Sequence, residues 1–446
     1  MKEKKATKGK KALIKVCIVI AAVALLAVGL FVLYKTCFDP FRGRVKNWVY
    51  SKNLDEKLTS EEITEDLDDL IKRLRARHPA WLEDGNEKVT AVEAQYKDEI
   101  AKLSGMTEAS VLYEWQAASR ILNKLGDGHT VVYGELETPL YIDDVTELRQ
   151  YGIPVRINGE ECSAVLDRFL RLFQYEMKER AELIFAQNVS ANKAYLEYCG
   201  VDVSDGVTYT YLVDGEEKDV HYSFVPVNEI KGYSPSSNNR SFVNYEIDKD
   251  RKVGIFELDE CNYNDEYRKT LKAFFEEVSA NGIESVIVDL RDNGGGNSAV
   301  ADEFIHYLDA DKYYRLPMDI RYGNLLIKFK NKLIKNKKLE PRFSGDVYIL
   351  TSTNTFSAAK DFTMLVKDSG LGTVVGEPSG NLPDSYGDSI NFMLPNSRLY
   401  YSMSFKRWFR IDETKRGLPL EADVPCKESE ALDVALELIE NKRNGK

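Results

Sequence analysis

The fold is decided by SVIVDLRDNGGGN at residues 285–297 and by DVYILTSTNTFSAAKDF at residues 346–362. Each stretch begins with a short apolar run, which is typical of a buried strand, and continues into a polar turn. A helical pattern follows each turn, near Ala299–Leu308 and over residues 357–369. Strands that alternate with helices in this way are typical of an α/β protein whose β-α units stack around one sheet.

Near the N-terminus the chain has an uncharged apolar run, VCIVIAAVALLAVGLFVLY, from Val16 to Tyr34. At 1.5 Å per residue this run approaches the thickness of a bilayer core, about 30 Å, so it predicts a transmembrane helix. A cleavable signal peptide is the alternative, but the run is longer than a usual signal core and no A-x-A-like site closes it. Seven lysines in residues 1–15 favour a cytoplasmic N-terminus. We therefore expect a single-pass protein of a bacterial cell membrane with an extracytoplasmic body.

Outside these two features, the patterns divide the chain into regions of different character. Apolar positions at helical spacing predict a helical subdomain, and strand-like and helical pieces alternate in the middle of the chain around a helix near 164–182. The polar segment KGYSPSSNNRS at residues 231–241 is typical of a linker. The expected regions are a basic tail (1–15), the transmembrane helix (16–34), the helical subdomain (50–132), the mixed region (133–245), the α/β core (246–426) and an amphipathic C-terminal helix (427–446).

Charge and cysteine content exclude several classes of function. The net charge is −11 despite the basic tail, so the body is strongly acidic and nucleic-acid binding is not expected. The six cysteines have no C-x-x-C or metal-like spacing, so neither a metal site nor a cofactor is predicted. Disulfides are compatible with an exported body, but their pairing cannot be read from the sequence.

Ser357 is the first candidate for chemistry, because it follows a buried strand and a short turn and begins a helix. Free N–H groups of a first helical turn point toward such a side chain, and that of Ala358 can help to hold an oxyanion. The alternative is ordinary, since a serine at a helix start is usually an N-cap.

Two further patterns are compatible with peptide hydrolysis. Gly294, Gly295 and Gly296 follow a strand, and glycines let the backbone approach a substrate and present its amides as oxyanion donors. A permissive tight turn is the alternative interpretation. His129 lies in LGDGHTVVY, flanked by a helix end, and an imidazole can take a proton from a serine and return it to a leaving amine.

Together these patterns resemble the tail-specific, or C-terminal processing, serine peptidases in their tricorn-like branch. The resemblance rests on D-G-H-T at Asp127–Thr130, D-L-R-x-N-x-G-G at Asp289–Gly296, and T-x-S-A-A at Thr355–Ala359 followed by V-V-G-E. It extends to HPAW at residues 78–81 and to SYGDSINFMLPNS at residues 385–397. It implies a crotonase-like catalytic core, a nucleophile at Ser357 and a base at His129.

The resemblance also implies an acidic residue that orients the imidazole. In RIDETKRGLPLEADVP, Glu413 is the best match, and Asp412, Glu421 and Asp423 remain alternatives. Many relatives carry a PDZ-like module that grips the substrate, and IPVRINGEECSAVLDRF at residues 153–169 resembles the end of one.

Three hypotheses follow for the activity. The first is an endopeptidase that cleaves protein or peptide substrates through an acyl-enzyme at Ser357, with His129 as base. The second is a Ser357/Lys360 dyad, since Lys360 lies three residues after the serine, although a surface lysine is the simpler interpretation. The third is a catalytically silent relative that binds peptides. The sequence does not indicate an oligomeric state.

The topology can be tested on intact cells. Protease added outside is expected to digest the body and to leave residues 1–15 protected, because the lysine-rich tail stays in the cytoplasm. Immunoblotting with antibodies to each part measures this. Protection of the body contradicts export, and a released form that begins after Tyr34 indicates a cleaved signal.

Overall fold

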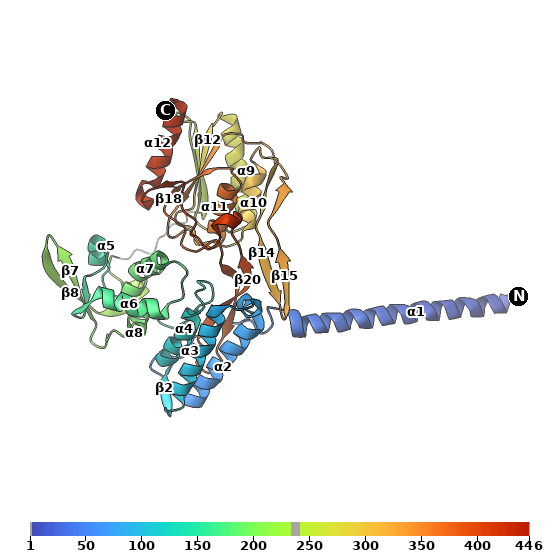
Figure 1. The fold of residues 1–446 in the computed structure, drawn as a ribbon, viewed down its shortest axis with the longest axis horizontal. Helices are drawn as coiled ribbons and strands as arrows, with labels where there is room; N and C mark the ends of the chain where they lie inside the picture. The colour runs from blue at the N-terminus through green and yellow to red at the C-terminus, as the bar shows by residue number, and fades with distance from the viewer. Residues whose placement is uncertain (1, 233–240, 446) are drawn as a thin grey trace.

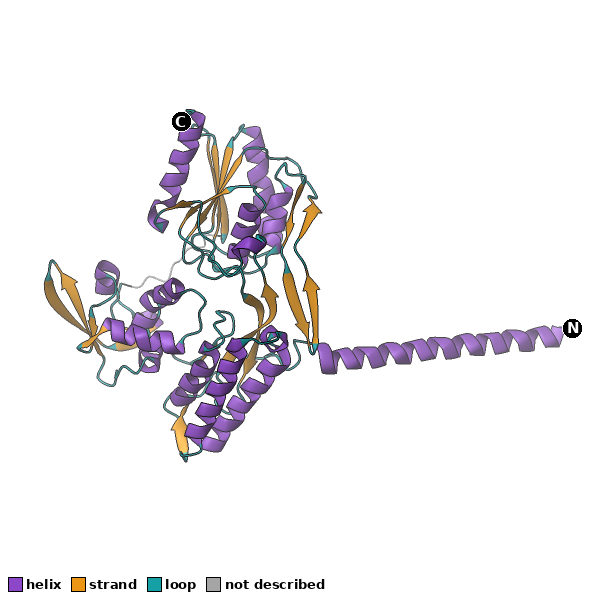
Figure 2. Cartoon of the chain, viewed as in Figure 1, coloured by secondary structure: helices purple, strands orange, loops and turns teal. Residues whose placement is uncertain are grey.

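The computed structural model describes residues 2–232 and 241–445 and shows a long N-terminal helix that projects from a body of helices and sheets (Figures 1 and 2). Helix α1 spans Lys2–Leu33 and continues as a π-helical turn, Tyr34–Phe38. Its segment Lys15–Phe38 is long and apolar enough to cross a membrane, by length and composition. The six cysteines all lie in the described parts of the chain, and none of them forms a disulfide.

Three helices form the region that the sequence predicted to be helical. Thr59 and Glu62 close a capping box at the start of α2, and the helix ends at His78, before Pro79. The apolar faces of these helices pack on one another and on the second sheet described below. Their bounds are α2 Ser60–Arg77, α3 Glu87–Leu103 and α4 Val111–Asn123, with the short strands β1 Lys57–Thr59 and β2 Glu108–Ser110 paired beside them.

The middle region is a small helical cluster beside a sheet of order β6-β5-β7-β8. The helix predicted near 164–182 is two helices, separated by an irregular break at residues 173–177. The predicted linker falls largely on residues 233–240, which lie outside the described residues. The elements are β4 Leu140–Ile142, α5 Thr146–Tyr151, β5 Arg156–Ile157, β6 Glu160–Glu161, α6 Cys162–Leu172, α7 Lys178–Gln187, α8 Lys193–Tyr198, β7 Val207–Val213, β8 Glu216–Tyr222 and β9 Phe224–Pro226.

The predicted α/β core is a three-layer arrangement. Its sheet has the order β10-β11-β12-β17-β18-β21, in which only β10 runs antiparallel to its neighbour. Helices α9, α10 and α11 cover one face and α12 covers the other (Figure 1). The bounds are β10 Val243–Asp248, β11 Val253–Leu258, α9 Asp265–Ala280, β12 Ser285–Asp289, α10 Ala299–His306, β17 Asp346–Thr351, α11 Ala358–Asp368, β18 Thr373–Gly376, β21 Val424–Pro425 and α12 Ala431–Arg443.

A second, antiparallel sheet joins this core to the helical region. Its order is β15-β14-β20-β19, and β3 pairs with β20. The strand β3 follows directly after the His129 loop, so this sheet fixes that loop relative to the core. The bounds are β3 Val132–Tyr133, β13 Lys312–Arg315, β14 Met318–Tyr322, β15 Leu325–Phe329, β16 Lys332–Lys335, β19 Tyr386–Met393 and β20 Tyr400–Trp408.

A buried carboxylate ties α2 to the turn between β19 and β20. Asp66 is fully buried, and it accepts hydrogen bonds from the amides of Asn396 and Ser397, each at 2.8 Å, and from the Ser397 hydroxyl at 2.9 Å. Bonds to a buried charged acceptor stabilise a fold by more than neutral ones do. This contact therefore holds the second sheet against the helices.

We expect Asp66→Ala to lower the free energy of unfolding by about 3 kcal/mol, because buried N–H groups lose their acceptor. Asp66→Asn, which keeps one acceptor, should cost less. The control is Glu61→Ala, an exposed first-turn position of the same helix, with an expected loss below about 1 kcal/mol. Urea unfolding followed by tryptophan fluorescence measures the three variants. Equal midpoints for Asp66→Ala and Glu61→Ala contradict the prediction.

Candidate active site

Ser357 lies between β17 and α11 in a backbone conformation that serine rarely adopts. Its φ is 53° and its ψ is −121°, and its side chain makes no capping hydrogen bond to the helix. Its amide donates to Oδ1 of the buried Asn381 at 2.8 Å, which holds the turn in this shape. Such outliers persist only where the surroundings fix them, and they cluster at functional sites. The ordinary N-cap interpretation of Ser357 therefore does not apply.

His129 meets Ser357, although 228 positions separate them in the sequence. The Nε2 atom of His129 lies 3.0 Å from Oγ of Ser357. The ring packs on that of Phe356 with centroids 4.8 Å apart. The Ser402 hydroxyl on β20 donates to the His129 carbonyl at 2.7 Å. The structure thus brings together the two residues that the sequence selected as nucleophile and base.

Asp127 fixes the loop that carries His129. Its carboxylate is fully buried and accepts hydrogen bonds from the His129 amide at 2.9 Å and from the Thr130 hydroxyl at 2.5 Å. Nδ1 of His78 accepts a hydrogen bond from the Ala80 amide at 3.3 Å. The proton of the His78 ring is therefore on Nε2, which donates to the Asp127 carboxylate at 3.1 Å. Burial alone raises the pKa of Asp127, but the hydrogen bonds from His78 and Thr130 outweigh it and hold that pKa well below its usual range.

His78 is therefore a positioning residue that sequence reasoning did not select. Its side chain is completely buried against Asp127. HPAW was part of the family resemblance, and that motif was the available signal.

Glu176 is a second residue that sequence reasoning missed. It lies in the break between α6 and α7, and its two oxygens accept from the amides of Gly128 at 3.3 Å and Leu382 at 3.0 Å. Its Oε1 is 3.9 Å from Nδ1 of His129, and Asp127 Oδ1 is 3.8 Å from the same atom. Burial, with the charge of Asp127 added, raises the pKa of Glu176 to about 8. No local pattern marks this residue, because its position depends on how the middle region docks.

The electrostatics of His129 favour the neutral imidazole. Burial lowers the pKa of His129, while the negative charge of Asp127 acts in the opposite direction. Within the described residues, Nδ1 has no hydrogen-bond partner, because both carboxyl oxygens are beyond bonding distance. A neutral ring with Nε2 facing a serine hydroxyl can accept its proton.

The glycine loop packs directly against the nucleophile, but its residues differ in role. A Cβ on Gly295 would lie 2.6 Å from Cβ of Ser357, so only glycine fits there. The Gly295 amide already donates to Asn293 Oδ1 at 2.8 Å, which corrects its assignment as an oxyanion donor. Within the described parts of the chain, the amides of Gly294 and Ala358 make no hydrogen bond and remain candidates.

Lys360 is buried, contrary to the simpler surface interpretation. Its side chain is 1% exposed, and its Nζ bonds Asp361 Oδ1 at 2.6 Å and the Pro383 carbonyl at 3.4 Å. Burial without an ion partner is costly for an ammonium group, so Asp361 accounts for its position.

The structure does not bring Glu413 to His129. Glu413 is 65% exposed and pairs with Arg416 at 3.2 Å. Its loop is held at the C-terminal end of α11, because Asp368 accepts from Arg410 and from the Asp412 amide. Ser357 lies at the opposite end of this helix, about 16 Å away along its axis. Among the described residues, only Asp127 and Glu176 place a carboxyl oxygen within 4.0 Å of His129, so the alternatives Asp412, Glu421 and Asp423 do not reach it either.

The donor atoms of Asp127, His129 and Glu176 lie within 4.8 Å of one another, a spacing compatible with a metal ion. However, the carboxyl oxygens there already accept backbone or side-chain hydrogen bonds, and the pKa of Glu176 is raised to about 8. A metal ligand must be deprotonated. The group is therefore better described as a hydrogen-bonding network.

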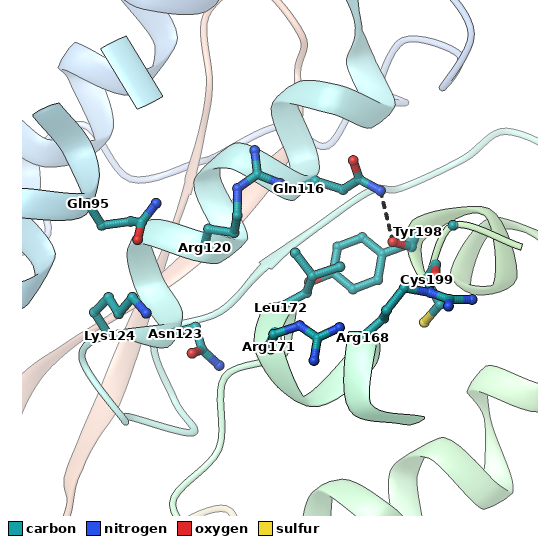
Figure 3. Close-up of a pocket in the computed structure, with 11 residues that line it drawn as sticks. Gln95, Gln116, Arg120, Asn123, Lys124, Arg168, Arg171, Leu172, Tyr198 and Cys199 are labelled. Atoms are coloured by element: carbon teal, nitrogen blue, oxygen red, sulfur yellow. Dashed lines mark hydrogen bonds between the residues drawn. The ribbon is translucent and has the colours of Figure 1, made fainter. Parts of the chain in front are cut away.

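A separate pocket of about 370 Å³ lies between α4 and the middle region (Figure 3). Arg120, Lys124, Arg168 and Arg171 line it, and Gln116 donates to the Tyr198 carbonyl across it at 2.9 Å. Neither the serine nor the histidine of the site contributes to its wall, so it is not the place of catalysis.

Comparisons with known proteins relate this chain to peptidases. The family model of peptidase family S41 matches residues 252–414, a range that includes the glycine loop and Ser357. Mature CPAF complexed with lactacystin has 13% identity and a TM-score of 0.61, with 87% of this chain and 99% of that chain covered. A serine-to-alanine mutant of CPAF has 14% identity and a TM-score of 0.65, with 86% of this chain and 98% of that chain covered. The photosystem II D1 C-terminal processing protease has 12% identity and a TM-score of 0.46, with 85% of this chain and 97% of that chain covered.

At these identities the likeness to CPAF concerns the fold alone. The family match is confined to residues 252–414. Residues 252–414 therefore match peptidase family S41, and the chain is a serine-type peptidase that acts on protein or peptide substrates.

Proposed function

We propose that this protein is a membrane-anchored, extracytoplasmic serine endopeptidase that forms an acyl-enzyme at Ser357 with His129 as general base. The observation that carries the proposal is the 3.0 Å contact between Oγ of Ser357 and Nε2 of His129. This distance is within the reach that proton transfer requires.

The reaction follows from this contact. Nε2 accepts the hydroxyl proton as Oγ attacks the peptide carbonyl, and the resulting imidazolium gives that proton to the leaving amine. A water molecule, deprotonated by the same nitrogen, then attacks the ester and releases the second product. The amides of Gly294 and Ala358 are the proposed donors to the oxyanion. Ala358 follows Ser357 directly, Gly294 precedes the Gly295 that packs on Ser357, and neither amide is engaged within the described residues.

We propose that Asp127 and Glu176 share the orienting role that the family resemblance gave to Glu413. Asp127 stays ionised, and its charge stabilises the imidazolium from 3.8 Å. Glu176 is largely protonated at neutral pH and aligns the His129 loop with the 381–383 loop through its two backbone contacts. The Nδ1 distances must shorten for a direct bond, as is common when a substrate tightens a catalytic site.

Lys360 is less favoured as the base. Its ammonium group is committed to Asp361 and to the Pro383 carbonyl, and a base must instead be uncharged. The positive charge lowers the pKa of His129, so Lys360 acts on the site through its charge.

We propose that α1 is the membrane anchor. Its segment Lys15–Phe38 is uncharged over most of its length and is followed by the whole catalytic body. The lysine-rich residues 1–15 favour the orientation with the body outside.

A silent peptide-binding relative is the second candidate, and the unpartnered Nδ1 of His129 is the observation that favours it. A fluorophosphonate serine probe separates the two classes. The peptidase reacts with the probe at Ser357, and His129→Ala abolishes this reaction. A folded wild-type chain that resists the probe supports the silent relative.

Ser357→Ala and His129→Ala should each lower kcat/KM for peptide cleavage by about 10⁴-fold or more, and the double variant should lose no more than either alone. The two residues act in one proton transfer, so their losses do not add. Steady-state kinetics on a fluorogenic peptide measures this.

The control variant is Lys360→Arg, which keeps the charge beside Asp361 but cannot act as a base. We expect turnover within about tenfold of the wild type, because His129 remains. A well-folded Lys360→Arg variant as inactive as Ser357→Ala would assign the base role to Lys360.

The pH profile tests Glu176. Activity needs neutral His129, so kcat/KM should fall as pH drops through the lowered pKa of His129, below its usual value of about 6.5. Above the Glu176 pKa of about 8, its carboxylate gains a charge 3.9 Å from Nδ1 and should raise activity by about tenfold. Glu176→Gln cannot ionise and should lack this alkaline gain, while it keeps near-normal activity at neutral pH. Identical profiles for the two proteins refute the role.

A further inference from the structure

An uninterrupted basic segment runs counter to the acidic character of the body. Residues 325–338 read LLIKFKNKLIKNKK, with six lysines and no carboxylate, in a chain whose net charge is −11. Apolar residues alternate with the lysines. Each basic side chain near an anionic membrane surface gains about 1 kcal/mol from the charge of the headgroups.

The segment forms one side of a two-stranded ribbon that leaves its apolar residues uncovered. β14 pairs with β15 and β13 pairs with β16, so residues 312–335 make one long hairpin. Leu325 is 50% exposed and Leu333 is 47% exposed. Large apolar side chains in such a row, beside charged residues, mark an interaction surface.

The lysines of the ribbon are largely free of counter-charges. Lys328 lies 4.0 Å from Asp319, and Lys338 pairs with Asp309 and Asp311. Within the described residues, no carboxylate lies within 4.0 Å of the remaining four, which are Lys330, Lys332, Lys335 and Lys337. The surface therefore offers uncompensated positive charge to a partner.

The ribbon lies on the side of the body from which α1 departs. In Figure 1, β15 is the element of the body beside the root of α1, and the β7–β8 hairpin lies at the opposite side. The tip of the ribbon, Gly323, packs so closely on the Cys37 carbonyl that a Cβ there would be 2.1 Å from it. A bilayer that contains α1 therefore faces the ribbon.

A pocket of about 430 Å³ opens at the same corner, where α1, α2 and the ribbon tip meet, and its lining has more basic side chains than carboxylates, which are Asp39 and Asp69. Arg42, Arg77 and Arg321 line it, and their guanidinium groups bond only backbone carbonyls among the described residues. The arginines of this pocket extend the positively charged surface of the ribbon to the place where α1 joins the body.

We propose that the ribbon of residues 325–337 docks on the anionic phospholipid headgroups of the membrane in which α1 is inserted. Its lysines bind the headgroup phosphates, and Leu325 and Leu333 enter the interface. This inference rests on the proposed anchor. The docked ribbon fixes the orientation of the body, because β14 is hydrogen-bonded to β20, the strand that holds the His129 loop.

Lysine labelling of the full chain in nanodiscs tests the contact. The chain is inserted into discs of phosphatidylcholine alone or of an equal mixture with phosphatidylglycerol, treated with an acetylating reagent, and analysed by mass spectrometry. Labelling of Lys330, Lys332, Lys335 and Lys337 should be about fivefold slower in the anionic discs, the factor expected for one basic residue at such a surface. Protection should disappear at about 1 M salt, where the Debye length is about 3 Å. Lys218, on the far β8 strand, should label equally in both discs.

Paired variants give the control. Lys330→Glu with Lys332→Glu should abolish the protection of Lys335 and Lys337, whereas Lys178→Glu with Lys218→Glu on the other side of the body should leave it intact. Cleavage of a short peptide should be unchanged in both pairs, which shows that the fold is kept. Equal labelling of the ribbon in the two kinds of disc, with the chain still co-eluting with them, overturns the docking alone. Failure of the chain to co-elute with either disc refutes the anchor instead.

Discussion

The buried carboxylate of Asp127 is the contact on which the catalytic arrangement depends. It gathers the His129 amide, the Thr130 hydroxyl and the His78 ring around one charge, and none of these donors is adjacent to the nucleophile in sequence. A buried charge is tolerated only when its hydrogen bonds are satisfied, so the loop has little freedom to move. The same charge lies 3.8 Å from Nδ1 of His129 and favours the imidazolium of the proposed mechanism.

The serine is constrained from the other side by close packing. Gly295 allows the glycine loop to touch Ser357, and Asn381 holds the Ser357 amide, so the strained turn is fixed by its neighbours. The break between α6 and α7 then inserts Glu176 between the histidine loop and the 381–383 loop. Three regions of the chain thus meet at one site, and the middle region contributes Glu176 and Arg180, which lies over the Phe356 ring.

The second sheet connects this site to the proposed membrane surface. β20 bonds the histidine loop on one side and β14 on the other, and β14 forms the ribbon with β15. Rigid strands transmit position over such distances because their hydrogen bonds fix register. Hydrogen-bonded strands therefore connect the ribbon to the catalytic site.

The sequence by itself determined the α/β core and the apolar N-terminal helix, because both depend on local periodicity. Its resemblance to the tail-specific peptidases also selected Ser357 and His129, which lie 228 positions apart. Only the tertiary structure decided the acid near His129, because Glu176 and Asp127 reach the ring from separate regions while Glu413 is held at the far end of α11. It also decided that Lys360 is buried and that Gly295 is needed because a Cβ at this position would collide with Ser357. A carboxylate in a loop looks the same in sequence wherever that loop folds, since its role depends on distances that only packing establishes.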